Sequence, residues 1–242
     1  MAYQDKNFNY IDAEAYDRRA ENSVLENYVL NLWQPFLKNI VKNLSVGKIV
    51  VDWGCGTCEY SQAAVNAKKI YAIDVSEPML KVCREKLANF GDKEIIHGSG
   101  FGKEIPAGIA DLVLTIGVWE YVDPKLLFEE LKRITKKGAK IIVVFPNIYS
   151  DLNWMRSLAK MRAVALRPGF IKKLFSAKGG SASGGKNDFK LLDSASFGYV
   201  FWVPKSLQFL ALPIWKFFDF IWSPFQKFLP LGVNVYYLFE RK

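Results

Sequence analysis

A glycine turn directly after an acidic strand end is the first feature of the sequence that could do chemistry. The stretch reads Ile-Val-Val-Asp-Trp-Gly-Cys-Gly over residues 49–56. Glycines at such a turn let a ligand approach the backbone, and a following helix offers unpaired N–H groups. The dinucleotide-binding pattern fails because its third glycine would fall on Glu59. A carboxylate at Asp52 repels a pyrophosphate and attracts an ammonium group, so the turn favours a sulfonium nucleoside with an amino-acid tail.

A second acidic residue, Asp74, ends the next β-branched run, twenty residues after Gly54. A carboxylate in this position accepts hydrogen bonds from both hydroxyls of a ribose. Its other role, capping the next helix, suits Ser76 better. We therefore predict that Asp74 binds the ribose of an adenosine ligand.

Alternating strands and helices are expected to position these two acids. The hydrophobic patterns predict strands at 48–51, 70–73, 94–96, 112–114, 139–145 and 233–240, and helices at 24–41, 59–67, 77–90 and 124–135. Pro35 is expected to kink or divide the first of these helices. Strands separated by helices imply right-handed crossovers. The predicted fold class is α/β, with a doubly wound, Rossmann-like sheet and helices on both faces.

The composition is that of an ordinary globular protein, with 242 residues, 50% apolar and 24% charged. The first thirty residues lack the basic and apolar regions of a secretory signal. The most apolar stretch, 207–222, is interrupted by Pro213, Lys216 and Asp219, whereas a membrane-spanning helix needs about 20 mostly apolar residues. We predict a cytoplasmic protein, with the inner face of a membrane as a further location.

Three cysteines, Cys55, Cys58 and Cys83, are sparse and odd in number. This argues for a reducing compartment and against a disulfide framework. The Cys55-x-x-Cys58 pair also fits a redox or metal site, but two thiols do not complete a tetrahedral zinc site. We expect small residues in a turn and no metal.

Basic and aromatic residues are concentrated after residue 150. The net charge is +9, and residues 151–190 contain nine basic and two acidic residues, including Lys172 and Lys173. Such a segment is either a solvated face or a contact for an anionic partner, such as nucleic acid, lipid head groups or an acidic substrate. A flexible loop is expected at 179–185, and twelve aromatic residues follow between 197 and 228. These aromatics are either core or, with Trp154 and Met155, an interfacial element that caps a cleft on an anionic membrane.

Four stretches together resemble the class I S-adenosylmethionine-dependent methyltransferases of the small-molecule type. They are residues 50–57, 73–80, 110–122 and 131–147, in the family's order and spacing. The resemblance covers 10–147 and 233–240. It implies a seven-stranded, mostly parallel sheet, with S-adenosylmethionine bound over the carboxyl ends of the first strands and S-adenosylhomocysteine as product.

The resemblance also implies roles for individual residues. The residues that would face the methionine moiety are Asp52, Gly54, Cys55 and Gly56, those at the ribose are Asp74 and Val75, and Met79, Ser99 and Gly100 would lie near the adenine. Those beside the sulfonium are Ile116 and Gly117, and Tyr16 and Arg19 would fold over the cofactor. The sequence departs from the family pattern at two positions. The family often has an acidic residue at the position of Ser99, and it usually has a glycine at the position of Cys58.

Catalytic residues are expected directly after the fourth strand, at Glu120 and Tyr121. Methyl transfer is an in-line displacement at an activated carbon, so positioning supplies most of the rate. Tyr121 stands where small-molecule members often have a histidine, which argues against a direct base. His97, the only histidine, is interpreted as structural.

Three functions stay open at this stage. A methyltransferase acting on a small or lipid-linked acceptor leads, an RNA methyltransferase using the basic 151–190 segment is second, and a non-catalytic cofactor-binding protein is third. Nucleic acid is the less favoured partner because Asn147 does not belong to the Asn-Pro-Pro-Tyr signature. The predicted organisation is an N-terminal helical segment (1–46), a cofactor-binding core (47–150), a substrate cap rich in basic and aromatic residues (151–232) and a final core strand (233–242).

Overall fold

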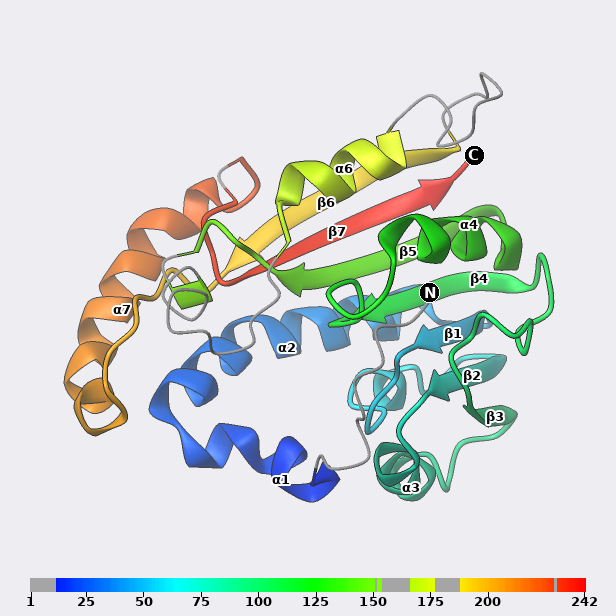
Figure 1. Cartoon of the computed structure of the whole chain (residues 1–242), viewed down its shortest axis with the longest axis horizontal. Coiled ribbons are helices and arrows are strands. Elements are labelled where there is room, and N and C mark those ends of the chain that lie inside the picture. The colour runs from blue at the N-terminus through cyan, green and yellow to red at the C-terminus, as the bar shows by residue number, and fades with distance from the viewer. Residues whose placement is uncertain (1–11, 151, 154–165, 177–187, 229) are drawn as a thin grey trace.

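The structure is a computed structural model of the whole chain, and it describes residues 12–150, 152–153, 166–176, 188–228 and 230–242. Within these residues, seven strands form one sheet in the order β3-β2-β1-β4-β5-β7-β6 (Figure 1). The strands span Ile49–Trp53 (β1), Lys69–Asp74 (β2), Lys93–His97 (β3), Ala110–Ile116 (β4), Thr135–Pro146 (β5), Phe189–Phe197 (β6) and Asn234–Arg241 (β7). β1 to β5 are parallel, whereas β7 runs antiparallel to both β5 and β6. The predicted mostly parallel sheet is confirmed.

Helices cover both faces of this sheet, as predicted. The α-helices of the described residues span Ala13–Asp17 (α1), Val24–Leu44 (α2), Glu77–Lys86 (α3), Pro124–Ile134 (α4), Pro168–Ser176 (α6) and Gln208–Trp222 (α7). Buried residues of α2, α3 and α7 pack on one face, and those of α4 and α6 pack on the other. Alternate strand residues, such as Val50 and Val51, belong to opposite cores, because successive side chains of a strand point to opposite faces.

One helix prediction is narrowed and another is wrong. Of the two effects predicted for Pro35, division does not occur, because Pro35 lies inside α2, which continues to Leu44. The helix predicted over 59–67 is replaced by tight turns and a short 3-10 helix, Ser61–Ala63 (η3). Cys58 adopts a left-handed backbone conformation with φ of 61°, which a right-handed helix cannot contain.

The strand β6 was not predicted, and it comes from the segment expected to be the cap. Its sequence, Phe-Lys-Leu-Leu-Asp-Ser-Ala-Ser-Phe, mixes charged and small polar residues because it is an edge strand with partial exposure. The core sheet therefore includes residues that the predicted boundary at 151–232 had excluded. Trp154, Met155, the predicted loop at 179–185 and most of the basic segment lie outside the described residues.

The topology also decides where α7 lies. Pro146 at the end of β5 and Phe197 at the end of β6 both pair with Asn234, the first residue of β7. The connection between β6 and β7, which contains α7, therefore emerges at the carboxyl end of β5. The parallel strands end on the side of the sheet where α1 and α7 lie (Figure 1).

Candidate active site

A cavity of about 240 Å³ opens at the carboxyl ends of β1, β2 and β4. All the predicted site residues except Gly100 line it. Gly100 lies behind the wall with φ of 80°, and a Cβ there would come within 2.1 Å of the Trp53 ring. Gly100 therefore serves close packing against Trp53, while its neighbour Ser99 reaches the cavity.

Backbone hydrogen bonds fix the conformation of the glycine turn after β1. The amides of Gly54 and Cys55 both donate to the Ile73 carbonyl of β2, at 2.8 and 3.0 Å. Gly54 has φ of 71°, and a Cβ there would lie 2.5 Å from Cγ2 of Val118. At Gly56, with φ of 53°, a Cβ would meet nothing within 4 Å. The first glycine is thus required by packing, and the second leaves backbone accessible beside the cavity.

Asp74 connects the glycine turn to the start of α3. Its Oδ2 accepts a hydrogen bond from the Gly56 amide at 2.8 Å, and its Oδ1 accepts one from the Ser76 amide at 2.9 Å. Burial raises the pKa of this carboxyl, and these amides oppose the shift. The Val75 amide also hydrogen-bonds to this carboxyl. The two carboxylate oxygens have four acceptor sites in all, so at least one stays available for a ribose hydroxyl.

Asp52 lies deeper in the wall and is only 2% exposed. Burial raises the pKa of its carboxyl to about 7; the hydrogen bond from Ser61 opposes this shift, and the charge of Asp74 adds to it. The Ser61 hydroxyl donates to Asp52 Oδ2 at 2.6 Å. A buried carboxyl of this kind is stabilised in its ionised form by an approaching cation.

The cavity wall has an excess of negative charge. The carboxyl groups of Asp52, Asp74 and Glu120 line it, against the guanidinium of Arg19. A fourth lining carboxyl, that of Glu59, is already paired with Lys38 and Lys86. Such a wall favours a ligand with positive groups and disfavours a polyphosphate. The S-adenosylmethionine implied by the resemblance has a sulfonium and an ammonium group, and it fits this charge.

Tyr16 and Arg19 of the N-terminal segment line the cavity. The Arg19 guanidinium lies 4.0 Å from the centre of the Tyr16 ring and donates to the Tyr16 carbonyl at 2.7 Å. Asp17 fixes this segment in place, because it forms an ion pair with Lys86 of α3 at 2.5 Å and accepts a hydrogen bond from Thr57. Sequence reasoning missed Asp17 and Lys86, because residues so far apart in the chain carry no local signal for their contact.

Glu120 and Tyr121 follow the turn after β4. Gly117 has φ of 69° and donates its amide to the Val144 carbonyl at 2.9 Å, which directs the chain across the cavity. Glu120 is 9% exposed and Tyr121 is half-buried. Both side chains reach the same cavity as the cofactor-binding candidates, so they are placed to contact an acceptor.

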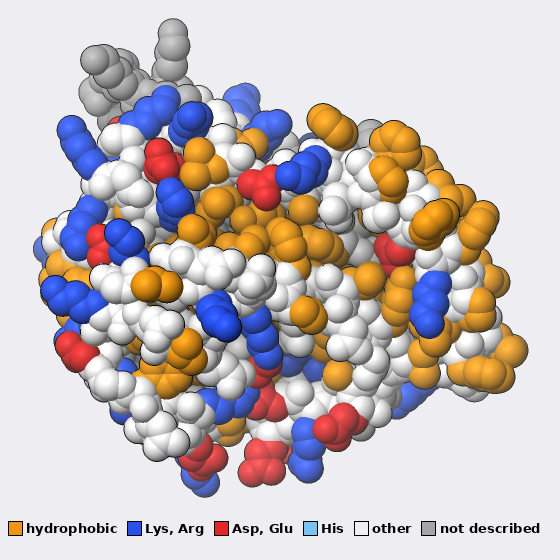
Figure 2. Space-filling view, turned by 180° about the vertical axis from the view of Figure 1, so that it is seen from behind, with side chains coloured by type: hydrophobic (Ala, Val, Ile, Leu, Met, Phe, Trp, Pro, Cys, Tyr) orange, Lys and Arg blue, Asp and Glu red, His pale blue; other side chains and the backbone are white. Residues whose placement is uncertain are grey.

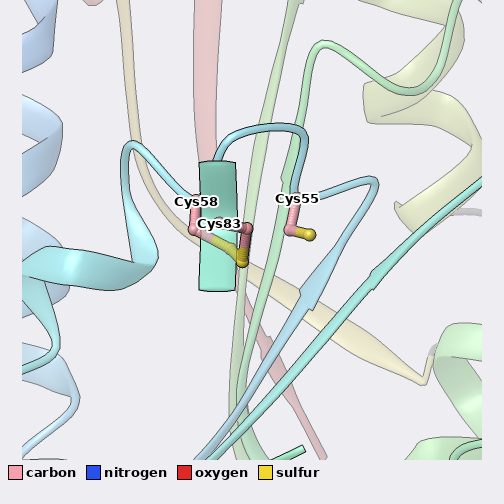
Figure 3. Close-up of side chains that lie close together, drawn as sticks. All are labelled: Cys55, Cys58 and Cys83. Carbon is pink, nitrogen blue, oxygen red and sulfur yellow. A yellow bond between two sulfur atoms is a disulfide. The ribbon is translucent and has the colours of Figure 1, made fainter. Parts of the chain in front are cut away.

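The cysteines correct an expectation. Cys58 and Cys83 form a disulfide between the turn and α3, and Cys55 is a buried free thiol beside them (Figure 3). The three sulfur atoms lie within 4.8 Å of one another. The sequence argued against a disulfide framework because the three cysteines are sparse and odd in number. Cys83 follows Cys58 by 25 residues, and the packing of α3 over the turn brings the two together. Cys58 takes the left-handed conformation that explains a glycine at this position in the family pattern.

Several lining residues were not predicted. They are Trp53, Thr57, Glu59, Tyr60, Ile73, Ser76, Gly98, Val118 and Val122. Most of them adjoin predicted residues in the chain. Their position at the end of a strand was therefore a sequence signal from which they could have been predicted. Glu59 and Tyr60 were instead assigned to a helix that does not form. His97 is exposed outside the cavity wall, and its Nε2 lies 2.9 Å from the Val75 carbonyl oxygen, as its structural interpretation expected.

Comparison with known proteins points to one kind of domain. Residues 51–143 match a family described as a methyltransferase domain. A demethylmenaquinone methyltransferase of Geobacillus stearothermophilus is 31% identical over 132 residues, which are 51% of this chain and 54% of that protein. The one from Anoxybacillus flavithermus is 28% identical over 139 residues, 54% of this chain and 56% of that protein. The chain thus spans about half the length of the curated relatives it matches.

Solved structures share the fold over nearly the whole chain. Magnesium protoporphyrin IX methyltransferase from Synechocystis, with bound S-adenosylhomocysteine, superposes with a TM-score of 0.63 at 14% identity, covering 96% of both chains. A methyltransferase of Thermotoga maritima described as a possible histamine N-methyltransferase gives 0.59 at 16% identity, covering 95% of this chain and 98% of that one. At these identities the likeness is one of fold.

Proposed function

We propose that this chain, which carries a class I S-adenosylmethionine-dependent methyltransferase domain, transfers a methyl group from S-adenosylmethionine to a small or lipid-like acceptor. The observation that carries the proposal is the charge of the cavity at the carboxyl ends of parallel strands, where the carboxyl groups of Asp52, Asp74 and Glu120 face the one guanidinium of Arg19. The sulfonium and ammonium groups of the cofactor suit that wall, and a pyrophosphate does not.

The residues of the glycine turn and β2 would hold the cofactor. Asp52 would face the ammonium group, Asp74 would accept a hydrogen bond from a ribose hydroxyl, and Met79 would pack on the adenine. The cofactor supplies a methyl group that is already activated, so holding the acceptor in line with it provides most of the rate. Arg19 and Tyr16 cover the site and exclude water from it.

Glu120 and Tyr121 would orient the acceptor. Both line the cavity and follow the Gly117 turn in the chain. A carboxylate at Glu120 can accept a proton from an acceptor hydroxyl, and the Tyr121 hydroxyl can donate a hydrogen bond to it. These are roles in positioning and proton transfer.

A lipid-like acceptor is supported by the curated relatives, which are named as demethylmenaquinone methyltransferases. We place the reaction in the cytoplasm, at the inner face of a membrane. The RNA alternative depends on the 151–190 segment, of which only 152–153, 166–176 and 188–190 are described. Methyl transfer from a labelled donor to a lipid extract, compared with transfer to RNA, separates the two acceptors. Transfer to neither would favour the non-catalytic alternative.

Calorimetric titration with S-adenosylhomocysteine and its 2′-deoxy analogue tests the cofactor assignment. The parent chain should prefer the ribose form by about 1.5–3 kcal/mol, the value of a hydrogen bond to a charged group, and should not bind NADH. Asp74→Asn should lose this preference, whereas Asp92→Asn, at an exposed acid before β3, should keep it. Equal affinity of the parent chain for both ligands would refute the role of Asp74, and no affinity for either would refute the proposed function.

A further inference from the structure

One side of α7 holds the helix firmly to the body of the protein. Trp215 is buried and stacks on Tyr28, with ring centres 6.2 Å apart. Asp219 accepts a hydrogen bond from the Tyr28 hydroxyl at 2.5 Å, and Gln208 accepts one from the Ser23 hydroxyl at 3.0 Å. The orientation of the helix is therefore determined by its inner side.

The opposite side of α7 and the turn after it are apolar and exposed. We call this the α7 surface, and its main residues are Phe209, Ile214, Phe217, Phe220, Ile221 and Phe228. Phe220 is 78% exposed and Phe228 is 80% exposed. Figure 2 shows these side chains as a concentration of hydrophobic groups on the right of the molecule, where α7 lies in that view. A helix that is apolar on all sides is normally buried, and large exposed patches mark interaction sites.

The exposed charge on the α7 surface is positive. Between residues 201 and 231 the acidic residue is Asp219, which bonds inward to Tyr28 and to the Tyr199 amide. Lys205 and Lys216 are exposed on the same stretch. Lys227, beside Phe228, is already paired with Asp193 of β6 at 2.9 Å. A symmetric pairing of two copies through Lys205 and Lys216 would place these lysines together with no outward-facing acid from residues 201–231 to neutralise them. An anionic lipid surface complements both the aromatic groups and the lysines.

The lysines predicted from the sequence to bind lipid are on another face. Lys172 and Lys173 belong to α6, which packs against the opposite side of the sheet from α7. The sequence-based prediction of a membrane contact through these two residues is not tested by their position, and Lys205 and Lys216 are instead the lysines that accompany the exposed phenylalanines.

We propose that the α7 surface inserts into the interface of an anionic lipid bilayer and lies in its plane. No helix in the described part of the chain has the length and apolar content to cross a membrane, and α7 has 15 residues, about 22 Å of helix against a hydrocarbon core of about 30 Å. Because α7 lies at the carboxyl end of β5, on the cofactor side of the sheet, this contact brings the cavity to the membrane. The further step, in which a lipid-like acceptor enters the cavity directly from the bilayer, rests on the proposed function.

Flotation with phosphatidylcholine vesicles, with and without phosphatidylglycerol, tests this contact. The full chain should associate with the anionic vesicles, and added salt should weaken the association. Phe217→Gln with Phe220→Gln should lower the partition coefficient at least about a hundredfold, because each buried phenylalanine contributes a factor of about ten or more. The matched control, Val46→Gln with Val65→Gln, changes side chains that are 57% and 58% exposed near the start of β1, and it should bind like the parent.

Thermal melting shows whether each variant is folded, and light scattering shows whether the chain dimerises without lipid. If the double phenylalanine variant melts early, Lys216→Gln provides a second test, with an expected loss of about fivefold on anionic vesicles. The proposal is overturned if the parent chain stays free at low salt, if both variants bind normally, or if the surface mediates a dimer without lipid. Calorimetry with S-adenosylhomocysteine on the same samples separates this result from the proposed function: a chain that binds vesicles but not this ligand keeps the contact and loses the enzyme assignment.

Discussion

The protonation of Asp52 should make cofactor affinity depend on pH. Burial, together with the nearby charge of Asp74, raises the pKa of the Asp52 carboxyl to about 7 although Ser61 donates a hydrogen bond to it. The ammonium group of S-adenosylhomocysteine interacts favourably with the carboxylate and not with the carboxylic acid. Affinity should therefore rise as the pH increases through 7.

The size of the effect follows from the ionised fraction. With a pKa of about 7, roughly one Asp52 in eleven is ionised at pH 6 and roughly ten in eleven at pH 8, so binding should tighten about tenfold between them. Calorimetry at pH 6 in buffers of different ionisation enthalpy should detect the release of about 0.9 proton per ligand bound. Without ligand, the folded chain keeps a proton that the unfolded chain releases. The free energy of unfolding should therefore fall as the pH rises from about 4 to 7.

Two variants identify the group responsible. Asp52→Asn should bind more weakly at pH 8 and show no rise in affinity across this range. Ser61→Ala should move the midpoint of the rise to higher pH, because the hydroxyl of Ser61 lowers the pKa of Asp52. Equal affinity of the parent chain at pH 6 and pH 8, or an unchanged pH dependence in Asp52→Asn, would refute the reasoning.

Three further results are expected. Gly54→Ala should lower the melting temperature and abolish S-adenosylhomocysteine binding, because the new Cβ would lie 2.5 Å from a valine side chain. The control is Gly108→Ala, also at positive φ but with nothing within 4 Å of the new Cβ. It should lower the free energy of unfolding only by the backbone strain of about 1–3 kcal/mol. Cys83→Ser, which removes the disulfide, should lower the free energy of unfolding by roughly 3 kcal/mol for a loop of this length; denaturation with and without reductant checks this, and the parent chain alone should respond to reductant. Glu120→Gln and Tyr121→Phe should reduce turnover in a labelled-methyl assay and leave ligand affinity unchanged; a parallel loss of affinity would make them structural residues.

The order of the core elements and most of the residues that line the cavity followed from the sequence. β-branched runs separated by helix-length segments predicted the parallel sheet, and the acids at the ends of two runs predicted which residues line one cavity. These inferences succeed because a buried parallel strand has a local signature, and because parallel strands end at the same edge of a sheet.

The remaining features needed the tertiary structure because they depend on residues far apart in the chain. The polar edge strand β6 is stabilised by pairing with β7, and its own sequence has no clear alternation. The disulfide between Cys58 and Cys83 exists because α3 packs over the glycine turn. The aromatic tail was ambiguous for the same reason, since apolar residues in sequence do not reveal which side of a helix finds a partner. Contacts with α2 bury Trp215 and leave the α7 surface exposed, and only tertiary packing makes that division.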